Sequence, residues 1–409
     1  MITVKRLLLL FSLLPVVAFA QVRTGIDVLE EEDGLGMFAG KRVGLLTNPT
    51  GVDAHLKSTI DIFYESPDVN LTTLFAPEHG VRGNQYAGTS VSNDKDDLTG
   101  LPVYSLHGKV RKPTPDMLRN VDVIVYDIQD VGCRSYTFIS SLGLLMEAAA
   151  ENDKEVVVLD RPNPLGGNKV EGPLVEQGYF SFVSQFAIPY IYGLTCGELA
   201  TLINAERPAG KRCRLSVVKM QGWHRNMTFA QTGLPWVPTS PQIPTSETAC
   251  FYPMTGICGE LGALNIGVGY TLPFHLFAAK WIDAIDFANA MNNLNLPGLA
   301  FRPIVFQPFF GSAGGSTLQG VQVYITDYEV ASLTEVQFYA IQVLHHLYPS
   351  KDVFTLGNVK SFAMFDNVCG SAKVRSLFAK RYQFSDVQQF WRKDAAAFRK
   401  KSAAYFLYD

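Results

Sequence analysis

The chain has 409 residues, with 35 basic and 38 acidic side chains and a formal net charge of −3. Its hydrophobic content of 47% and charged content of 18% exclude a disordered protein. The slightly negative charge and the lack of a basic patch exclude a typical nucleic-acid-binding protein, and the length predicts two domains.

The first 20 residues have the pattern of an export signal. Lys5 and Arg6 precede an apolar run, Leu7–Val17, which leads into Ala18-Phe19-Ala20. A charged start, an apolar run too short to cross a bilayer and an A-x-A motif predict a signal peptide over residues 1–20. We therefore expect an exported, periplasmic chain that begins at Gln21; a buried N-terminal strand is the alternative. No later apolar run reaches the ~18 residues that a membrane span needs.

Short apolar runs alternate with helical patterns as far as about residue 220. The clearest helix is Phe138–Ala150, and the pair Thr195 and Glu198 forms a T-x-x-E capping box that begins a helix ending at Glu206. Several runs are continuous in Val, Ile and Leu, which is typical of parallel strands covered on both faces. We expect strands at Arg42–Leu46, Val69–Phe75, Pro102–Leu106, Val121–Tyr126, Val156–Leu159 and Leu215–Val218. This alternation predicts a doubly wound, mostly parallel, Rossmann-like α/β domain over residues 21–245.

The pattern changes after about residue 220. A proline-rich stretch is expected to be neither helix nor central strand, because of Pro235, Pro238, Pro241, Pro244 and Pro253. Beyond it we expect strands near Phe301–Phe306 and Val321–Ile325, and helices near Asp283–Asn293, Leu333–Tyr348 and Asp386–Lys401. These elements predict a smaller C-terminal α+β domain over residues 246–409.

The cysteines and histidines do not have the spacing of a metal site. None of the six cysteines forms a C-x-x-C motif, and the seven histidines form no H-E-x-x-H pair, so we expect no metal. Cys250 and Cys258 are the most local candidates for a disulfide, with buried free thiols as the alternative.

Polar residues collect where the predicted strands end. In open parallel sheets the ligand crevice lies outside the carboxyl ends of the strands. Four such ends predict one mouth, lined by Asn48, Glu78, His79, Arg82, Asp127, Gln129, Asp130, Arg134, Asp160, Arg161 and Asn163. For any single Asp or Asn, capping a helix or fixing a turn is the alternative.

The motifs of nucleotide and serine-hydrolase sites are absent. No G-x-G-x-x-G follows the first strand, no P-loop motif occurs, and there is no G-x-S-x-G elbow. The glycines from Gly311 to Gly315 have no helix after them and indicate a turn. We therefore expect no cofactor. The remaining carboxylates, amides, arginines and aromatics suit sugar chemistry, in which a carboxylic acid protonates the leaving oxygen.

Four ordered blocks resemble the NamZ-type peptidoglycan exo-β-N-acetylmuramidases. They are Ala76-Pro77-Glu78-His79-Gly80, the segment Asp127–Gly132, the segment Leu159–Pro164 and Gly197-Glu198-Leu199-Ala200. The resemblance covers essentially all of the chain after residue 20. It implies a Rossmann-like domain without nucleotide, a C-terminal auxiliary domain and a shallow cleft between them. The implied activity is release of terminal N-acetylmuramic acid from the non-reducing end of peptidoglycan fragments. No obligate protein partner is evident from the sequence.

The sequence also departs from the pattern of that family. The departures fall at Ile191-Tyr192, at Gln242, at Val268 within Gly267–Tyr270, and in the block that begins at Glu260. We interpret these as substrate-facing positions that have lost charge. Two alternatives therefore stay open: a glycosidase of the same fold that acts on a different hexosamine, and a non-catalytic protein that binds peptidoglycan sugars.

The resemblance implies Glu78 as the catalytic residue, and we assign it the role of general acid. Asp130 is the expected second catalytic group, with Asp127 and Asp160 as alternatives, and Tyr136 is expected to stabilise the oxocarbenium-like centre; the 2-acetamido group of the substrate is a further candidate. Arg82, Arg134 or Arg161 would pair with the lactyl carboxylate of muramic acid, or else hold a loop carboxylate. The expected substrate-binding residues are Asn48, His79, Arg82, Gln129, Arg134, Asp160, Arg161, Asn163 and Glu260.

Overall fold

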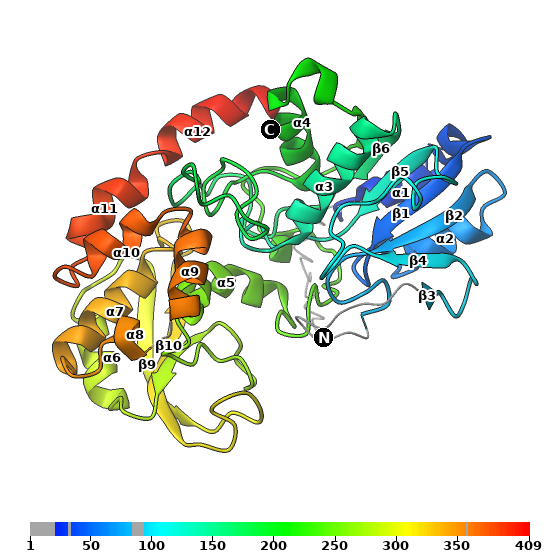
Figure 1. Ribbon diagram of the computed structural model, residues 1–409. Coiled ribbons are helices and arrows are strands. Elements are labelled where there is room, and N and C mark those ends of the chain that lie inside the picture. Colours follow the sequence, from blue (N-terminus) through cyan, green and yellow to red (C-terminus); the bar gives the residue numbers. More distant parts are fainter. Residues whose placement is uncertain (1–20, 32–33, 84–93, 357–358) are drawn as a thin grey trace, which may run out of the picture.

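The computed structural model describes residues 21–31, 34–83, 94–356 and 359–409. The predicted signal peptide, residues 1–20, lies outside the described residues. A large sheet with helices forms one end of the molecule, and a smaller sheet with its own helices forms the other (Figure 1). Helix α5 (Ser246–Gly259) lies between these two parts (Figure 1).

The large sheet has seven strands among the described residues, in the order β3-β4-β2-β1-β5-β6-β7. Six are parallel, and the two-residue β3 pairs antiparallel with β4 at one edge. Apart from β3, this is the doubly wound Rossmann order, and the order reverses between β1 and β5. The strands are β1 (Arg42–Thr47), β2 (Asn70–Ala76), β3 (Asp94–Lys95), β4 (Pro102–Ser105), β5 (Val123–Asp127), β6 (Glu155–Leu159) and β7 (Arg214–Val218). The predicted fold class is confirmed.

Side chains of the central strands alternate between two core layers. Val43 and Leu45 of β1 pack in the layer that contains α1 (Gly25–Glu31) and α2 (Thr59–Glu65). Leu46 points the other way, into the layer that contains α3 (Phe138–Glu151) and α4 (Cys196–Glu206). Because both faces are covered, apolar residues are needed at every position, which explains the continuous apolar runs.

The predicted capping box at the start of α4 is present. The hydroxyl of Thr195 accepts the N–H of Glu198 at 3.2 Å, and Glu198 Oε2 accepts the N–H of Thr195 at 3.1 Å. Oε1 of the buried Glu198 accepts from Arg225 at 2.7 Å and from the N–H of Leu407 at 2.9 Å. The end of the chain therefore returns to the large-sheet part, close to α4 (Figure 1).

The C-terminal part contains an antiparallel sheet in the order β8-β10-β9. Its strands are β8 (Leu276–Ala279), β9 (Leu299–Phe306) and β10 (Leu318–Ile325). Its other helices are α6 (Ala284–Asn292), α7 (Val336–Leu347), α8 (Val353–Leu356), α9 (Val359–Cys369), α10 (Ala372–Phe378), α11 (Ser385–Arg392) and α12 (Ala395–Ser402). Short 3₁₀ turns occur at Gly34–Phe38, Ala209–Lys211, Phe229–Gln231 and Ala403–Tyr405.

The prediction of a single helix over Asp386–Lys401 is wrong in one respect. The structure has two helices there, α11 and α12. The division falls at Lys393 and Asp394. Asp394 Oδ2 accepts the N–H of Leu174 at 2.9 Å, so this bend ties the C-terminal helices to a loop of the large-sheet part.

The prediction for Pro253 is also wrong. Pro253 lies inside α5, where a proline costs about 3 kcal/mol relative to alanine. The helix forms nevertheless, because Phe251, Met254 and Ile257 are buried in the C-terminal core and Thr245 caps its first turn. The other four prolines of that stretch lie outside helices and strands, as predicted.

All six cysteines are free thiols, as the alternative to a disulfide predicted, and all except Cys250 are buried. Cys250 and Cys258 lie on the same helix, α5. Eight residues of helix separate them by about 12 Å along the axis, beyond the reach of a disulfide.

Candidate active site

Glu78 lies on the loop that follows β2 and is the most open of the predicted catalytic carboxylates. Its side chain is 22% exposed. The loop turns sharply, because the N–H of Gly80 bonds to the carbonyl of Pro77 at 3.1 Å and His79 has a positive φ of 73°. A non-glycine residue in that conformation stores roughly 1–3 kcal/mol of strain. Such strain is typical of loops that hold a functional side chain in place.

Two residues that were not among the predicted site residues lie against the Glu78 carboxylate. Thr137, the residue before α3, donates from its hydroxyl to Glu78 Oε2 at 3.3 Å. His107 Nδ1 lies 3.9 Å from the same oxygen. His107 follows β4, the third parallel strand along the chain, whose carboxyl end is not one of the four from which the site was predicted. Glu78 was predicted because it follows the carboxyl end of a parallel strand, and the same criterion would also have selected His107.

Tyr136 lies between β5 and α3 and contacts the proline-rich stretch. Its hydroxyl is hydrogen-bonded to the hydroxyl of Thr239 at 2.8 Å. Burial raises the pKa of the Tyr136 hydroxyl above its usual value, and the charges of Asp130 and Glu78 raise it further. Tyr136 is therefore neutral and lies within electrostatic reach of both predicted catalytic carboxylates.

Asp130 is buried and incompletely hydrogen-bonded. Its Oδ1 accepts the N–H of Gly132 at 2.7 Å and the hydroxyl of Tyr192 at 2.8 Å. Its Oδ2 is buried and has no hydrogen-bond partner in the described part of the chain. Burial raises the pKa of this carboxyl to about 7. A carboxyl that titrates near neutral pH is suited to proton transfer or to charge stabilisation.

Asp127, one alternative to Asp130, is committed to an internal ion pair. Arg161 contacts both of its oxygens, at 2.5 and 2.9 Å, and the hydroxyl of Thr59 donates to Oδ2 at 2.5 Å. Arg161 also donates to the carbonyl of Val52 at 2.7 Å. Both side chains are buried. This pair fixes the ends of β5 and β6 relative to each other.

Asp160, the other alternative, is also saturated by protein groups. Its oxygens accept from the N–H groups of Arg161 and Gly197, at 3.0 and 2.8 Å, and from the hydroxyls of Thr195 and Tyr408, both at 2.6 Å. Burial raises the pKa of its carboxyl to about 6. Asp160 therefore joins β6, α4 and the end of the chain, and none of its oxygens lacks a protein donor.

Three predicted amide side chains are also buried in this polar layer. The Nδ2 of Asn163 donates to the carbonyl of Leu194 at 2.9 Å, and Gln129 Nε2 donates to the carbonyls of Asp130 and Pro162 at 2.9 and 2.7 Å. Asn48 Oδ1 accepts from Thr50, which fixes the turn after β1. These contacts hold the loops in place, which is the alternative role considered above for such polar side chains.

The crevice at the point where the strand order reverses is largely filled. The cavity lined by Thr50, Gln129 and Arg161 has a volume of about 20 Å³. Phe229, Leu234, Pro235 and Val237 form its other wall. This volume holds about one water molecule, so the place where Rossmann folds bind a dinucleotide is closed by the chain itself.

Arg82 and Arg134 differ in their partners. Arg82 pairs with both oxygens of Asp96, at 2.9 and 3.0 Å. Arg134 is fully buried and donates to the carbonyls of Pro173, Ile188 and Val368, at 2.6–2.8 Å, and to the hydroxyl of Ser184. Burial lowers the pKa of its guanidinium to about 10. Arg82 and Arg161 thus hold loop carboxylates, whereas Arg134 holds carbonyl groups.

An open pocket of about 590 Å³ lies next to this site in the C-terminal part. Tyr252, on its wall, contacts the ring of Tyr136 at 5.5 Å, and the hydroxyls of Tyr252 and Ser135 are 3.0 Å apart. Glu260 is exposed at the end of α5 and lines the same pocket, whose walls raise the pKa of its carboxyl through desolvation. Glu260 and Tyr252, whose ring contacts Tyr136, therefore line the same pocket.

The departures from the family pattern lie in two different environments. Ile191 and Tyr192 are fully buried, so the interpretation of these two positions as substrate-facing is wrong. Val268 lines the open pocket, and Gln242 is half-buried.

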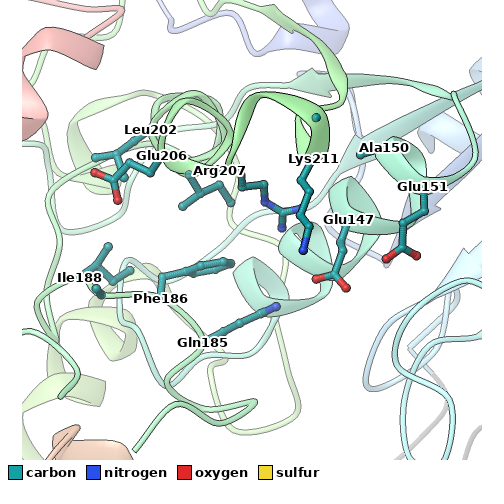
Figure 2. A pocket seen from close by; sticks show the side chains of 13 residues that line it. Glu147, Ala150, Glu151, Gln185, Phe186, Ile188, Leu202, Glu206, Arg207 and Lys211 are labelled. Atoms are coloured by element: carbon teal, nitrogen blue, oxygen red, sulfur yellow. The ribbon is translucent and has the colours of Figure 1, made fainter. Parts of the chain in front are cut away.

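A second pocket, of about 550 Å³, lies between α3 and α4 (Figure 2). Glu147 and Glu151 come from α3, and Arg207 and Lys211 come from the segment after α4 (Figure 2). None of the predicted site residues lines this pocket.

Among the described residues, no group of three or more His, Cys, Asp and Glu side chains is arranged to hold a metal ion. None of the helices in this part of the chain has both the length and the apolar character needed to cross a membrane.

Two family models match the chain in succession. The model described as the N-terminal part of exo-β-N-acetylmuramidase NamZ matches residues 43–247, and the model of the C-terminal part matches residues 250–408. The chain is also similar to the peptidoglycan β-N-acetylmuramidase NamZ of Bacillus subtilis (strain 168). The two are 43% identical over 388 residues, which cover 95% of this chain and 92% of that protein.

Two solved structures from Bacteroides fragilis NCTC 9343 have the same fold; both are described as DUF1343 family proteins. The first has a TM-score of 0.91 and 56% identity, and the second has a TM-score of 0.72 and 26% identity. Each comparison covers 95% of this chain and 99% of the other.

These matches and the Rossmann-like sheet define the class of this protein, which is a glycoside hydrolase. More specifically, the chain belongs to the NamZ family of exo-β-N-acetylmuramidases. The resemblance drawn from the four sequence blocks is confirmed.

Proposed function

We propose that this protein is an exo-acting glycoside hydrolase that releases terminal N-acetylmuramic acid from the non-reducing end of peptidoglycan fragments. Its substrate would be a peptidoglycan-derived sugar or muropeptide. The family and the relative from Bacillus subtilis support the substrate class.

One observation supports Glu78 as the general acid. Its side chain is 22% exposed, whereas Asp127, Asp130 and Asp160 are each at most 4% exposed. A general acid must reach the glycosidic oxygen of a bound sugar. Asp127 and Asp160 are enclosed by protein donors, and Glu78 is the most exposed carboxylate of this set.

Asp130 is our candidate for the second catalytic group. Its Oδ2 is the atom of that carboxyl still able to accept a hydrogen bond. The N–H of a 2-acetamido group is a suitable donor, and a carboxylate that holds it would assist attack of the acetamido oxygen on the anomeric carbon. The hydroxyl of Tyr136, whose raised pKa keeps it neutral, is our candidate for a contact that stabilises the oxocarbenium-like centre.

A panel of chromogenic substrates tests this proposal. The wild-type protein should release nitrophenol from nitrophenyl β-N-acetylmuraminide and leave the N-acetylglucosaminide essentially intact. Preference for the glucosaminide would favour the alternative of another hexosamine substrate. Inactivity on both, combined with saturable binding of peptidoglycan sugars, would identify a binding protein.

We also propose that residues 1–20 are removed during export to the periplasm, on the basis of their charged, apolar and A-x-A pattern. N-terminal sequencing from the native host should yield Gln21. Recovery of intact Met1 in the cytoplasm would contradict export. Because no cofactor or metal motif occurs in the sequence, we further expect activity to be unchanged by dialysis against EDTA.

A further inference from the structure

An exposed aromatic loop borders the open pocket of the C-terminal part. The loop connects β9 to β10 and carries Phe309 and Phe310, which are 72% and 55% exposed. The next three residues, Gly311, Ser312 and Ala313, line the pocket. We call Phe309 and Phe310 the aromatic lip. Large exposed aromatic rings at the edge of a pocket are typical of a binding surface.

The lip is held in place by a neighbouring loop. The ring of Phe309 stacks on Tyr270 at 5.8 Å, and Tyr270 packs against Phe306 of β9 at 4.7 Å. The N–H of Phe309 donates to the carbonyl of Gly269 at 2.7 Å. Gly269 has a φ of 91°, and a Cβ atom there would lie 2.5 Å from the carbonyl oxygen of Phe310. The two loops can approach this closely because residue 269 is glycine.

A row of contacting aromatic rings leads from Tyr136 into the pocket. Tyr136 contacts Tyr252 at 5.5 Å, and Tyr252 contacts Phe274 at 4.9 Å. Tyr252 and Phe274 both line the pocket, together with Trp281. Polar groups accompany the rings, because Glu260, Asn265 and Lys280 line the same space.

This combination suits a carbohydrate. A sugar ring has apolar C–H faces that pack on aromatic rings and hydroxyl edges that need polar partners. The volume of about 590 Å³ is in the range of pockets that enclose whole ligands of several rings. An exo-acting enzyme places one terminal sugar at the catalytic acid, so the rest of the fragment must extend away from it.

We propose that the aromatic lip and this pocket form the subsite for the sugars on the reducing-end side of the cleaved bond. This inference rests on the proposed function. Phe309 and Phe310 stack on the leaving part of a peptidoglycan fragment and set a preference for oligosaccharides over single sugars with small leaving groups.

The test compares two substrates in the Phe309→Ala/Phe310→Ala double variant. For a peptidoglycan tetrasaccharide, kcat/KM should fall about tenfold or more, the usual effect of removing aromatic contacts from a binding site. For nitrophenyl β-N-acetylmuraminide it should be unchanged, because that substrate has no further sugars. Equal losses on both substrates, or no loss on the tetrasaccharide, would overturn the proposal.

Two control variants accompany the test. Phe309→Tyr/Phe310→Tyr retains the rings and should retain the preference for the tetrasaccharide. Ile285→Ala removes a side chain that is 61% exposed on α6 and does not line the pocket, so it should have no effect. Because the lip side chains are exposed, the wild-type protein and the variants should have the same melting temperature. A preference that Ile285→Ala also abolishes would contradict a specific role of the lip.

A binding measurement separates this proposal from the proposed function. Titration calorimetry of the tetrasaccharide with Glu78→Gln protein should give a Kd about tenfold weaker when the lip is also removed. That result holds whether or not muraminides are hydrolysed, whereas inactivity of wild-type protein on muraminides would contradict the proposed function alone. An unchanged Kd would overturn the inference. If the wild-type protein also bound vesicles and the lip variant did not, the lip would be a membrane contact instead.

Discussion

The hydroxyl of Tyr192 donates a 2.8 Å hydrogen bond to Oδ1 of Asp130. Tyr192 is one of the positions at which the chain departs from the pattern of its family, and it lies behind the candidate site rather than in it. Burial raises the pKa of Asp130, while the bonds from Gly132 and Tyr192 lower it, and the balance is a pKa of about 7. Tyr192 therefore positions a carboxyl and keeps its pKa within the physiological range.

Replacement of Tyr192 by phenylalanine should shift the pH dependence of activity. The hydrogen bond favours the ionised form of Asp130, so its loss should raise the pKa of that carboxyl by about one unit. If Asp130 acts in its ionised form, the acidic limb of the kcat profile should move to higher pH. Tyr190→Phe is a matched control, because Tyr190 is equally buried and its hydroxyl contacts Ser135 instead. An acidic limb that does not move would argue against Asp130 as a catalytic group.

Asp130 should also make folding stability depend on pH. Its folded pKa of about 7 lies above the value in an unfolded chain, so the folded protein retains a proton that the unfolded chain releases. Stability from this group is fully present below about pH 4 and is lost as the pH rises to about 7. Asp160, with a pKa of about 6, contributes in the same direction.

Asp130→Asn removes the titration, so this variant should lose less stability than the wild type between pH 4.5 and 7.5. We expect the difference to be on the order of a few kcal/mol. Urea unfolding at the two pH values measures it. If the free energy of unfolding changed equally between the two pH values in both proteins, Asp130 would titrate as an ordinary carboxyl.

Glu78→Gln should separate proton donation from binding. Glutamine retains the size of the side chain but cannot protonate a glycosidic oxygen. Turnover of an unactivated disaccharide should fall about 10²–10⁴-fold. A nitrophenyl substrate needs less protonation and should lose less, while binding changes little. Equal losses on both substrates would indicate a nucleophile or a structural anchor, and full activity would remove Glu78 from the mechanism.

Gly132→Ala should destabilise the loop that holds Asp130. Gly132 has a φ of 81°, and a Cβ atom there would lie 2.3 Å from Asn163 Oδ1. We expect a loss of about 2–4 kcal/mol, measured by urea unfolding. Gly40→Ala is the control, because Gly40 has a φ of 75° and nothing within 4 Å of the added atom. The difference between the two variants measures the contact with Asn163, and equal losses would show that backbone strain alone is responsible.

The sequence predicted the parallel strands well, because strands covered on both faces must be apolar at every position. It did not predict α5 or the division between α11 and α12. In those places burial and long-range contacts decide the structure, as for Pro253 within α5 and for Asp394 bonded to Leu174. A local pattern contains no information about such distant partners.

The same limit applies to the site. The rule for strand ends selected polar residues from the loops that follow the strands, but it could not tell which of them would be buried. Asp127 and Asp160 became internal anchors because Arg161 and Tyr408 reach them from other segments. His107 was predictable from the end of β4, whereas Thr137 was not, because its contact with Glu78 depends on where α3 begins.

The buried guanidinium of Arg134 has a consequence for how the molecule unfolds. It belongs to the loop after β5, yet one of its bonds ends on the carbonyl of Val368 in α9, near the other end of the chain. Removal of the C-terminal part would take away the acceptor of Nη2 of this guanidinium, while Nε and Nη1 keep theirs, and loss of a hydrogen bond to a buried charged group is costly. The two parts should therefore unfold as one cooperative unit, with a single calorimetric transition. An isolated large-sheet part would not retain the loop geometry on which Asp130 and Tyr136 depend.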